Sequence, residues 1–399
     1  MMKLYEKEKC SGCGTCVIAC PTTAITLIND RNGYSYPRID KDKCIECGKC
    51  LRVCHFNDFN YFGKENICAY AAVARDNEVL KKSASGGVFA TLAKYIINLG
   101  GIVYGAAWNP DFTVEHRGIE RIDDITLLQS SKYSQSRAYH VFPEIREYLD
   151  KGRIVLFSGT PCQISGLYSY LKNDRENLYT IDIICHGVPS NKMLQDDIKF
   201  FEKKYQRRAK SVSFRTKDRG WGTSGSICFD DKIIVYSSIS SPYYYYFLNN
   251  AIFRDSCYNC RFSRENRVGD LTIGDYWGIE TAHPGFKIDE TKGVSCILVN
   301  SIKGKKILEK NKNQLLYEKS TLQMIRERNH QLVSPCKEPT NRTTILELFA
   351  ANDYQKLYNY WLKEAGKDRA IEVLKNIVPN KIKKQAKIVK WKINRFKAR

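Results

Sequence analysis

Short apolar runs alternate with amphipathic stretches through the middle of the chain. Each apolar run has the length of one buried strand, and each amphipathic stretch has the spacing of a helix. The predicted strands are residues 69–74, 102–106, 153–157 and 178–184, and the predicted helices are residues 85–99, about 161–171 and the stretch after 190. This alternation indicates a domain built on an α/β or mixed sheet.

The pattern changes at both ends of the chain. Near the start, residues 24–28 and 34–36 predict a β-hairpin closed by an Asn-Gly turn. Beyond residue 340 the signals are helical. Residues 381–399 contain nine Lys or Arg and no acidic residue, and their apolar positions recur every three or four residues. We expect a basic amphipathic helix there, which lies on an anionic membrane, binds an acidic partner or packs on its own domain.

Length and composition describe an ordinary globular protein. The 399 residues suggest two or three domains. A content of 43% hydrophobic and 27% charged residues excludes global disorder. No run of about 18 apolar residues occurs, so no transmembrane helix is expected. No apolar segment follows Lys3, as a secretory signal would require, so we expect a cytoplasmic protein, with peripheral contact at the inner membrane face through residues 381–399.

The sixteen cysteines point to chemistry. Cytoplasmic thiols stay reduced, so regularly spaced cysteines indicate metal binding or catalysis. The first eight form two C-x-x-C-x-x-C-x-x-x-C runs, at residues 10–20 and 44–54. Bacterial two-cluster ferredoxins hold 4Fe–4S clusters with this spacing, and the fourth cysteine of each run ligates the other cluster. The predicted ligand sets are Cys10, Cys13, Cys16 and Cys54 for one cluster, and Cys20, Cys44, Cys47 and Cys50 for the other.

The same runs predict a small ferredoxin-like domain at residues 1–63. Zinc ribbons also use paired C-x-x-C motifs, but zinc does not explain the repeated third and fourth cysteines. So short a segment buries little core, and inorganic clusters would stabilise it. His55 stands where the ferredoxin pattern has a second proline.

The net charge of +21 narrows the range of partners. Each oxidised cubane with four thiolates carries about −2, so two clusters leave about +17. A basic protein of this size suits a polyanion, an anionic membrane or an acidic protein. The sequence lacks a helix-turn-helix, an RNP motif and a helicase P-loop, so we expect no nucleic-acid partner.

Three turns of the central domain carry further candidate chemistry. A Ser-Gly-Gly turn opens the helix at residues 85–99 as a phosphate seat would, although such caps also occur without a ligand. A Ser-Lys-Tyr segment at 131–133 gathers hydroxyls around a lysine, which is also usual in a solvated loop. Thr160 fits an N-cap and Pro161 the first helical position, so Cys162 falls in the first turn, where the helix dipole favours a thiolate.

Four of the remaining cysteines lie in such turns. Cys162 and Cys185 each follow a predicted strand, and ligands gather at the carboxyl ends of strands in α/β sheets. Cys257 and Cys260 form a C-x-x-C pair. These four thiols make a workable shell for a third 4Fe–4S cluster, although each could be a buried structural thiol. The cysteines outside motif turns are Cys68, Cys228, Cys296 and Cys336.

Together these motifs resemble the beta-subunit family of coenzyme F-420 hydrogenases and dehydrogenases over about residues 5–300. The resemblance is carried by Ser-Gly-Gly at 85–87, Ser-Lys-Tyr at 131–133, Gly-Thr-Pro-Cys-Gln at 159–163, Cys-His-Gly-Val-Pro-Ser at 185–190, and the stretch from the Cys257/Cys260 pair to Asp-Tyr-Trp-Gly at 275–278. It implies an FAD-binding catalytic domain at residues 64–340. The candidate FAD-binding residues are Ser85, Gly86, Gly87, Ser131, Lys132, Tyr133, Gly159 and Thr160.

One motif departs from the archaeal members, which follow the cysteine at the position of Cys185 with Met-Glu-Asn. This chain has His186-Gly187-Val188, which is similar to bacterial members associated with surface-polysaccharide biosynthesis, so the substrate need not be F-420. His186 is the only histidine in a motif turn and is the candidate proton donor. In this family's Thr-Pro-Cys turn, Cys162 could face the flavin rather than bind iron.

The resemblance implies an α+β or mixed α/β iron–sulfur flavoprotein. The ferredoxin-like and FAD-binding domains would precede a helical extension at residues 341–399. Electrons would pass singly between the clusters and ferredoxin or another redox protein, and FAD would exchange them in pairs with a small-molecule substrate. The alternative is an electron-transfer subunit of a larger redox complex, with no substrate of its own.

Overall fold

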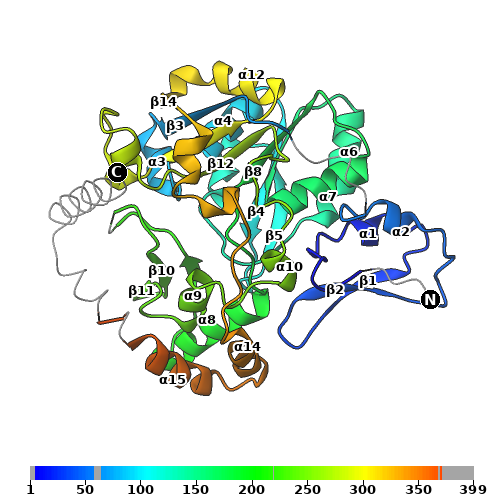
Figure 1. Cartoon of the computed structure of the whole chain (residues 1–399), viewed down its shortest axis with the longest axis vertical. Helices are drawn as coiled ribbons and strands as arrows, with labels where there is room; N and C mark the ends of the chain where they lie inside the picture. Colours follow the sequence, from blue (N-terminus) through cyan, green and yellow to red (C-terminus); the bar gives the residue numbers. More distant parts are fainter. Residues whose placement is uncertain (1–4, 58–63, 219, 367–368, 371–399) are drawn as a thin grey trace, which may run out of the picture.

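A nine-stranded mixed sheet forms the centre of the molecule (Figure 1). The structure is a computed structural model that describes residues 5–57, 64–218, 220–366 and 369–370. The strand order is β14-β3-β13-β12-β8-β7-β4-β5-β6, in which β4, β7, β8 and β12 run parallel to one another. The strands are β3 (Cys68–Ala74), β4 (Ile102–Trp108), β5 (Val114–Ile119), β6 (Ser136–Arg137), β7 (Val155–Gly159), β8 (Leu178–Ile183), β12 (Leu271–Asp275), β13 (Ser295–Val299) and β14 (Leu315–Ser320). The mixed sheet and the four predicted strands are confirmed.

Helices cover both faces of this sheet. They are α3 (Asn77–Lys82), α4 (Val88–Asn98), α5 (Ile125–Leu128), α6 (Phe142–Asp150), α7 (Pro161–Leu171), α11 (Ile279–Ala282), α12 (Ile302–Lys310) and α13 (Leu322–Arg326), with short 3-10 turns at Ile122–Asp124, Tyr139–Val141, Glu290–Lys292, Lys312–Gln314 and His330–Leu332. Side chains of β7 alternate between two cores. Leu156 packs with Leu92 of α4, whereas Phe157 packs with Ile145 of α6 and Leu167 of α7. The parallel strands are therefore buried on both faces.

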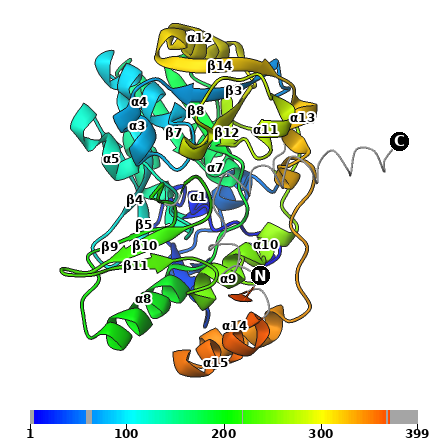
Figure 2. The same cartoon turned by 90° about the vertical axis from the view of Figure 1, so that its left-hand side faces the viewer.

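A second, aromatic-rich core lies beside the main sheet (Figure 2). Its elements are β9 (Ser211–Ser213), β10 (Gly225–Cys228), β11 (Ile233–Tyr236), α8 (Asn191–Tyr205), α9 (Pro242–Leu248), α14 (Arg342–Ala350) and α15 (Tyr354–Glu364). The buried carboxylate of Asp197 in α8 accepts hydrogen bonds from Tyr236 (2.5 Å), Ser241 (2.9 Å) and Tyr354. The helical signals beyond residue 340 are confirmed by α14 and α15. The three-stranded sheet was not predicted, because strands of three or four residues are too short for a periodic signal.

The cysteine-rich N-terminal segment packs against the main sheet's helix α7 and against the aromatic core. It contains the predicted hairpin, β1 (Ile25–Asn29) and β2 (Ser35–Ile39), and two helical turns, α1 (Thr15–Ile18) and α2 (Lys49–Arg52). Thr15 Oγ1 donates a hydrogen bond to the carbonyl of Gly166 in α7 (3.2 Å). The Tyr34 hydroxyl donates to the carbonyl of Ile252 (2.9 Å). These contacts fix the segment on the rest of the chain.

Two sequence predictions fall outside the described residues: the domain boundary after residue 63 and the basic helix at 381–399. Within the part of the chain that the structure describes, no helix combines the length and the apolar character needed to span a membrane.

Close packing of the N-terminal segment predicts a large effect of Gly14→Ala. Gly14 has a φ of +74°, and an added Cβ would lie 2.0 Å from the Tyr139 ring. Gly100 provides a matched control, because its φ is +73° and nothing lies within 4 Å of an added Cβ. Backbone strain should cost each variant about 1–2 kcal/mol. The clash should cost Gly14→Ala about 1–3 kcal/mol more.

Thermal unfolding of anaerobically purified variants measures this difference. Gly14→Ala should unfold at a clearly lower temperature than Gly100→Ala and retain less iron. Equal unfolding temperatures would contradict the contact between the cysteine loop and Tyr139.

Candidate iron–sulfur centres and flavin site

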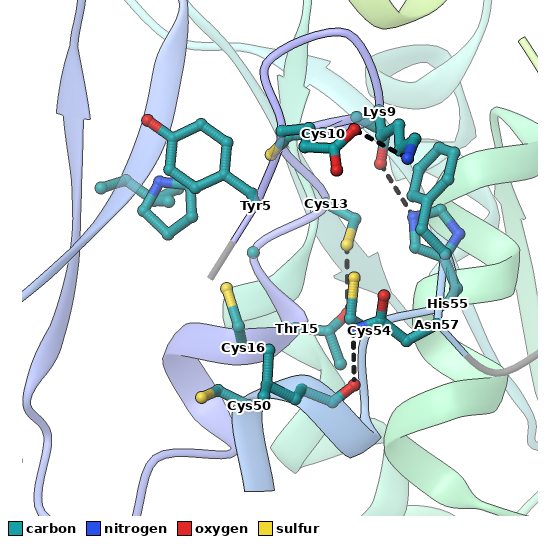
Figure 3. A pocket seen from close by; sticks show the side chains of 18 of the residues that line it. Tyr5, Lys9, Cys10, Cys13, Thr15, Cys16, Cys50, Cys54, His55 and Asn57 are labelled. Atoms are coloured by element: carbon teal, nitrogen blue, oxygen red, sulfur yellow. Dashed lines mark hydrogen bonds and ion pairs between the residues drawn. The ribbon is translucent and has the colours of Figure 1, made fainter. Parts of the chain in front are cut away.

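The first predicted ligand set surrounds a cavity of about 260 Å³ (Figure 3). Cys10, Cys13, Cys16 and Cys54, which we call the proximal set, all line it. Burial tends to raise the pKa of the Cys13 thiol, but the charge and hydrogen bond of His55 and the hydrogen bonds of Thr15 outweigh it and lower the pKa to about 6. Thiolate is the form that binds iron. Burial raises the pKa of Cys10, Cys16 and Cys54, so bound iron itself would keep these three thiols deprotonated. Four thiols around one cavity fit a cluster.

His55, the departure from the ferredoxin pattern, links the proximal set to the main sheet's helices. Its buried ring lies 3.0 Å from Ser11 Oγ and 3.2 Å from Ser165 Oγ of α7. The ring also stacks on Phe262, with 5.5 Å between ring centroids. A proline at this position could not make the two polar contacts.

The second predicted set lies at the surface end of the N-terminal segment. Cys20, Cys44, Cys47 and Cys50, which we call the distal set, line a cavity of about 20 Å³. Cys47 is exposed, and the neighbouring Ile45 keeps 64% of its surface accessible. The backbone N–H of Ala24 donates to Cys20 Sγ (3.3 Å). A cluster held here would lie close to solvent.

The third predicted set is brought together at one edge of the sheet. Cys162, Cys185, Cys257 and Cys260 line a single cavity of about 40 Å³. Strands β7 and β8 are parallel neighbours, so the turns that follow them carry the first two cysteines to the same edge. The other two lie in and just after α10 (Asp255–Tyr258). Thr160 and Gln163 form a capping box at the start of α7, with Pro161 at the first helical turn as predicted.

A buried ion pair holds these elements in place. Arg267 Nη2 lies 2.9 Å from Asp182 Oδ1 at the end of β8, and both residues are almost fully buried. The other carboxylate oxygen of Asp182 accepts the backbone N–H groups of Val268 (3.1 Å) and Gly269 (2.9 Å). The segment that follows the C-x-x-C pair is thereby fixed to the strand that precedes Cys185.

A fifth thiol, which the sequence analysis placed outside the motifs, also lines the third cavity. Cys336 Sγ lies 3.2 Å from the carbonyl oxygen of His186, in a segment with no motif to mark it. His186, the candidate proton donor, lines the same cavity, and its Nδ1 lies 2.9 Å from Gln331 Nε2. Burial lowers the pKa of His186.

The three cavities form a row. Cys50 lines both the distal and the proximal cavity, and Ser11 and Phe56 line both the proximal and the third. Among the described residues, no three His, Cys, Asp or Glu side chains lie close enough together to hold a metal ion. A cubane is larger than one ion, so its four thiolate ligands surround a space rather than meet at a point.

The predicted flavin residues near residue 86 take part in packing. The Gly86 N–H, which a phosphate seat would leave free, donates to Ser295 Oγ (2.9 Å). A Cβ on Gly86 would lie 2.2 Å from the carbonyl oxygen of Ala72 in β3. Ser85 Oγ donates to the carbonyl of Val294 (2.8 Å). This turn therefore fits the start of α4 closely against the sheet.

The other predicted flavin residues lie in two further places. Gly159 ends β7, and Thr160 lines the third cavity. Ser131 and Lys132 lie in the loop before β6, where Lys132 Nζ donates to the carbonyls of Leu127 (3.1 Å) and Gln129 (2.6 Å). Burial lowers the pKa of Lys132 to about 7.

Arg215, which the sequence analysis did not single out, joins Tyr133 to the Asp-Tyr-Trp-Gly motif. Its Nη1 donates to the Tyr133 hydroxyl (3.1 Å), and both Nη atoms bind the Asp275 carboxylate, at 2.7 and 3.0 Å. Trp221 Nε1 donates to the same carboxylate (2.9 Å), and its ring stacks on Trp277 at 4.8 Å. These residues gather planar aromatic groups and a cation beside the predicted turns.

Lys217 adds a second cation to this place. Its Nζ donates to the carbonyl of Ser85 (2.7 Å) and to that of Leu80. Burial and the charge of Arg215 lower the pKa of Lys217 to about 8. Both Arg215 and Lys217 follow β9 in a loop with no motif, and a basic pair in a loop is common on protein surfaces.

The fold and the cysteine sets define an iron–sulfur protein of the electron-transfer class. Residues 9–57 match the 4Fe-4S dicluster domain, and residues 152–323 match the family of the C-terminal region of the coenzyme F420 hydrogenase/dehydrogenase beta subunit. The chain thus contains a region of this family, preceded by the dicluster domain, which confirms the resemblance. No curated protein matches the chain.

Among solved structures, a chain of the F420-reducing NiFe hydrogenase complex from Methanosarcina barkeri is similar to this chain, at 17% sequence identity and a TM-score of 0.48. The similarity covers 72% of this chain and 94% of that chain.

Iron content tests the third set. We expect about twelve iron and twelve acid-labile sulfide per chain in anaerobic protein, as three 4Fe–4S clusters require. The double variant Cys257→Ser/Cys260→Ser should hold about eight. Cys336→Ser is the matched control, because Cys336 lines the same cavity but lies outside the predicted ligand set. It should keep about twelve. About eight iron in all three proteins would return Cys257 and Cys260 to a structural role.

Proposed function

We propose that the protein is an iron–sulfur flavoprotein oxidoreductase that exchanges single electrons with a ferredoxin-type protein and electron pairs with a small-molecule substrate. The observation that carries the proposal is the row of three cysteine-lined cavities, which runs from the surface at Cys47 into the main domain. Bound FAD would supply the conversion between one-electron and two-electron chemistry. The family match supports this assignment.

The distal end of the row suits a redox partner. Cys47 and Ile45 are exposed there, so a partner can approach the distal set closely. Lys41, Lys43 and Lys49 are exposed around them. Asp40, Asp42 and Glu46 are exposed beside these lysines and balance their charge, and Lys43 pairs with Asp40 at 3.3 Å. It is the net charge of +21 on the chain as a whole that favours an acidic one-electron carrier.

The cluster of aromatic and basic side chains around Arg215, which includes Tyr133, Lys217 and Trp277, suits a flavin. Arg215 Nε is buried and has no hydrogen-bond partner among the described residues. Neither Lys132 nor Lys217 forms an ion pair with a described carboxylate, and both donate only to backbone carbonyls. Such cations are suited to a pyrophosphate, and Tyr133 and Trp277 offer flat surfaces to a ring. We assign the FAD site to this place, with the turn at residues 85–87 beside it.

The third cavity then lies between the ferredoxin-like segment and the flavin domain. Cys162 and Cys185 are half-buried in its walls, each in the turn that follows a strand of the main sheet. His186 lies in these walls and is proposed to hold the proton that two-electron chemistry needs. The identity of the substrate, including F-420 or a surface-polysaccharide intermediate, stays a prediction, as does membrane contact through residues 381–399.

Flavin content and electron donors test the proposed function. Denatured protein should release about one yellow, fluorescent flavin per chain. The holoprotein should be reduced by one of three donors: ferredoxin, NAD(P)H or reduced F-420. Folded protein with full iron that neither contains nor takes up flavin would contradict the proposal. Flavin that is reduced by ferredoxin, with no small-molecule acceptor or donor, would support the electron-transfer subunit instead.

Replacing Lys217 should weaken FAD binding. A charge-assisted hydrogen bond to phosphate contributes about 1.5–3 kcal/mol, so Lys217→Gln should lower FAD affinity about tenfold or more. The control is Lys303→Gln, because Lys303 of α12 is likewise half-buried and bound to two backbone carbonyls, but forms an ion pair with Asp174 (2.6 Å) away from the proposed flavin site. Fluorescence titration of flavin-stripped protein measures both. Equal affinities would move the flavin site elsewhere.

The same lysine should make FAD binding depend on pH. Because burial and Arg215 lower its pKa to about 8, Lys217 loses its positive charge as the pH rises through that value. FAD affinity should therefore fall between about pH 7 and about pH 9. Lys217→Arg keeps the charge over this range and should flatten the profile. A wild-type profile as flat as that of Lys217→Arg would argue against contact between Lys217 and the cofactor.

A further inference from the structure

One buried arginine differs from the others in its partners. Four arginines of the described chain are buried: Arg215, Arg254, Arg267 and Arg342. Arg215 forms an ion pair with Asp275, Arg267 with Asp182, and Arg342 with Asp255. Among the described residues, no Asp or Glu lies within ion-pair distance of Arg254, whose exposed fraction is 0%. A buried charge is costly unless an opposite charge compensates it.

Neutral groups take up the hydrogen-bond donors of Arg254. Its Nε donates to the carbonyl of Cys10 (2.7 Å), its Nη1 to Gln135 Oε1 (2.9 Å), and its Nη2 to the carbonyl of Ser35. The guanidinium also lies 4.3 Å from the centre of the Tyr36 ring. These contacts orient the guanidinium but leave its full positive charge uncompensated.

The nearest acid in sequence is engaged elsewhere. The Asp255 carboxylate lies 2.5 Å from Arg342 Nη2, on one side, and 3.5 Å from Lys7 Nζ, on the other. The missing negative charge near Arg254 must therefore come from a group that is not an Asp or Glu of the described chain.

Arg254 lies between two cysteine sets. It lines the third cavity, and its Nε bonds the backbone of Cys10 in the proximal set. Its charge acts on Cys10 on one side and on Cys162 and Cys257 on the other. Each oxidised 4Fe–4S cluster with four thiolates carries about −2. The donor sets thus supply negative charge at both ends of this guanidinium.

We infer that Arg254 is the shared counter-charge of the proximal and third clusters and sets the reduction potentials of both. Reduction adds one negative charge to a cluster, and a fixed cation nearby stabilises the reduced state more than the oxidised state. Arg254 therefore raises both potentials relative to a neutral residue. Its charge acts on the clusters through space, from a position fixed by its hydrogen bonds to the carbonyls of Cys10 and Ser35. The inference rests on the three-cluster assignment made above.

Removing the charge tests the inference directly. Arg254→Gln removes the positive charge but supplies an amide that can still donate hydrogen bonds. Arg254→Lys keeps the charge but loses the planar guanidinium with its several donors. EPR-monitored redox titration of the anaerobic holoprotein measures each cluster's midpoint potential. In Arg254→Gln, the equilibrium constant for reduction of the proximal and third clusters should fall at least tenfold, about 59 mV for a one-electron couple. The distal cluster serves as the internal reference and should keep its potential. Arg254→Lys should stay close to the wild type.

A second variant leaves Arg254 in place and supplies the carboxylate that it lacks. Gln135→Glu is nearly isosteric, and its carboxylate can accept the same hydrogen bond from Nη1, but it gives up the bond that Gln135 Nε2 donates to the carbonyl of Ser11 (3.3 Å). It should pair with the guanidinium and lower the same two potentials. This variant keeps the test valid if Arg254→Gln fails to retain its clusters.

The outcomes separate the inference from the proposed function. Wild-type protein with only about eight iron would contradict the third cluster, whatever Arg254 does. About twelve iron, with both midpoints unmoved in Gln135→Glu, would overturn the role of Arg254 alone. Lower midpoints for the proximal and third clusters, with the distal midpoint unchanged, would establish it. An equal drop at all three clusters would also overturn it, since it would indicate a general loss of structure.

Discussion

The buried pair between Arg267 and Asp182 holds together the part of the molecule on which its chemistry depends. Asp182 is the penultimate residue of β8, and its carboxylate also accepts hydrogen bonds from two backbone N–H groups of the segment that follows the C-x-x-C pair. Every contact of this carboxylate thus joins the sheet to a segment distant in sequence. A fully hydrogen-bonded buried pair specifies one arrangement strongly, because breaking it leaves a charge without a partner in the protein interior. The two halves of the third cysteine set lie on either side of this junction.

The ferredoxin-like segment is attached to this framework by packing of Tyr34 and Tyr36 in the aromatic core and by polar contacts to the backbone. Thr15, Tyr34 and Arg254 donate to main-chain carbonyls across the boundary, and Ser190 Oγ donates to the carbonyl of Asn32 (2.5 Å). Carbonyl groups have fixed positions once the secondary structure has formed. The distance between the proximal and third cavities is therefore set by rigid elements, α1 and α7 above all.

Some features could be predicted from the sequence because their signals are local. The cysteine runs, the Thr160-Pro161 helix start and the Asn-Gly hairpin each depend on neighbours within a few residues, and the structure contains the predicted hairpin and helix start. Arg215, Lys217 and Cys336 had no such signal, since each acquires its place only through contacts far along the chain. The Ser-Gly-Gly turn shows the opposite case. Its local motif predicted a phosphate site, but the Gly86 N–H donates to Ser295 Oγ, and Gly86 packs closely against the carbonyl of Ala72.

The distribution of the cysteines along the chain has a consequence for biogenesis. The proximal and distal sets come from one short segment, which leaves the ribosome before the cysteines of the third set. The third set combines two cysteines in the turns after β7 and β8 with two in and just after α10, which is much later in the chain. Its four thiols therefore come together only after the parallel strands have paired. Insertion of iron and sulfide thus follows an order that the chain itself imposes. The two ferredoxin-type sites could be loaded during synthesis, whereas the proposed third cluster would have to wait for the completed fold. On that proposal, a folding defect in the sheet would leave a protein with about eight iron and without the proposed link to FAD.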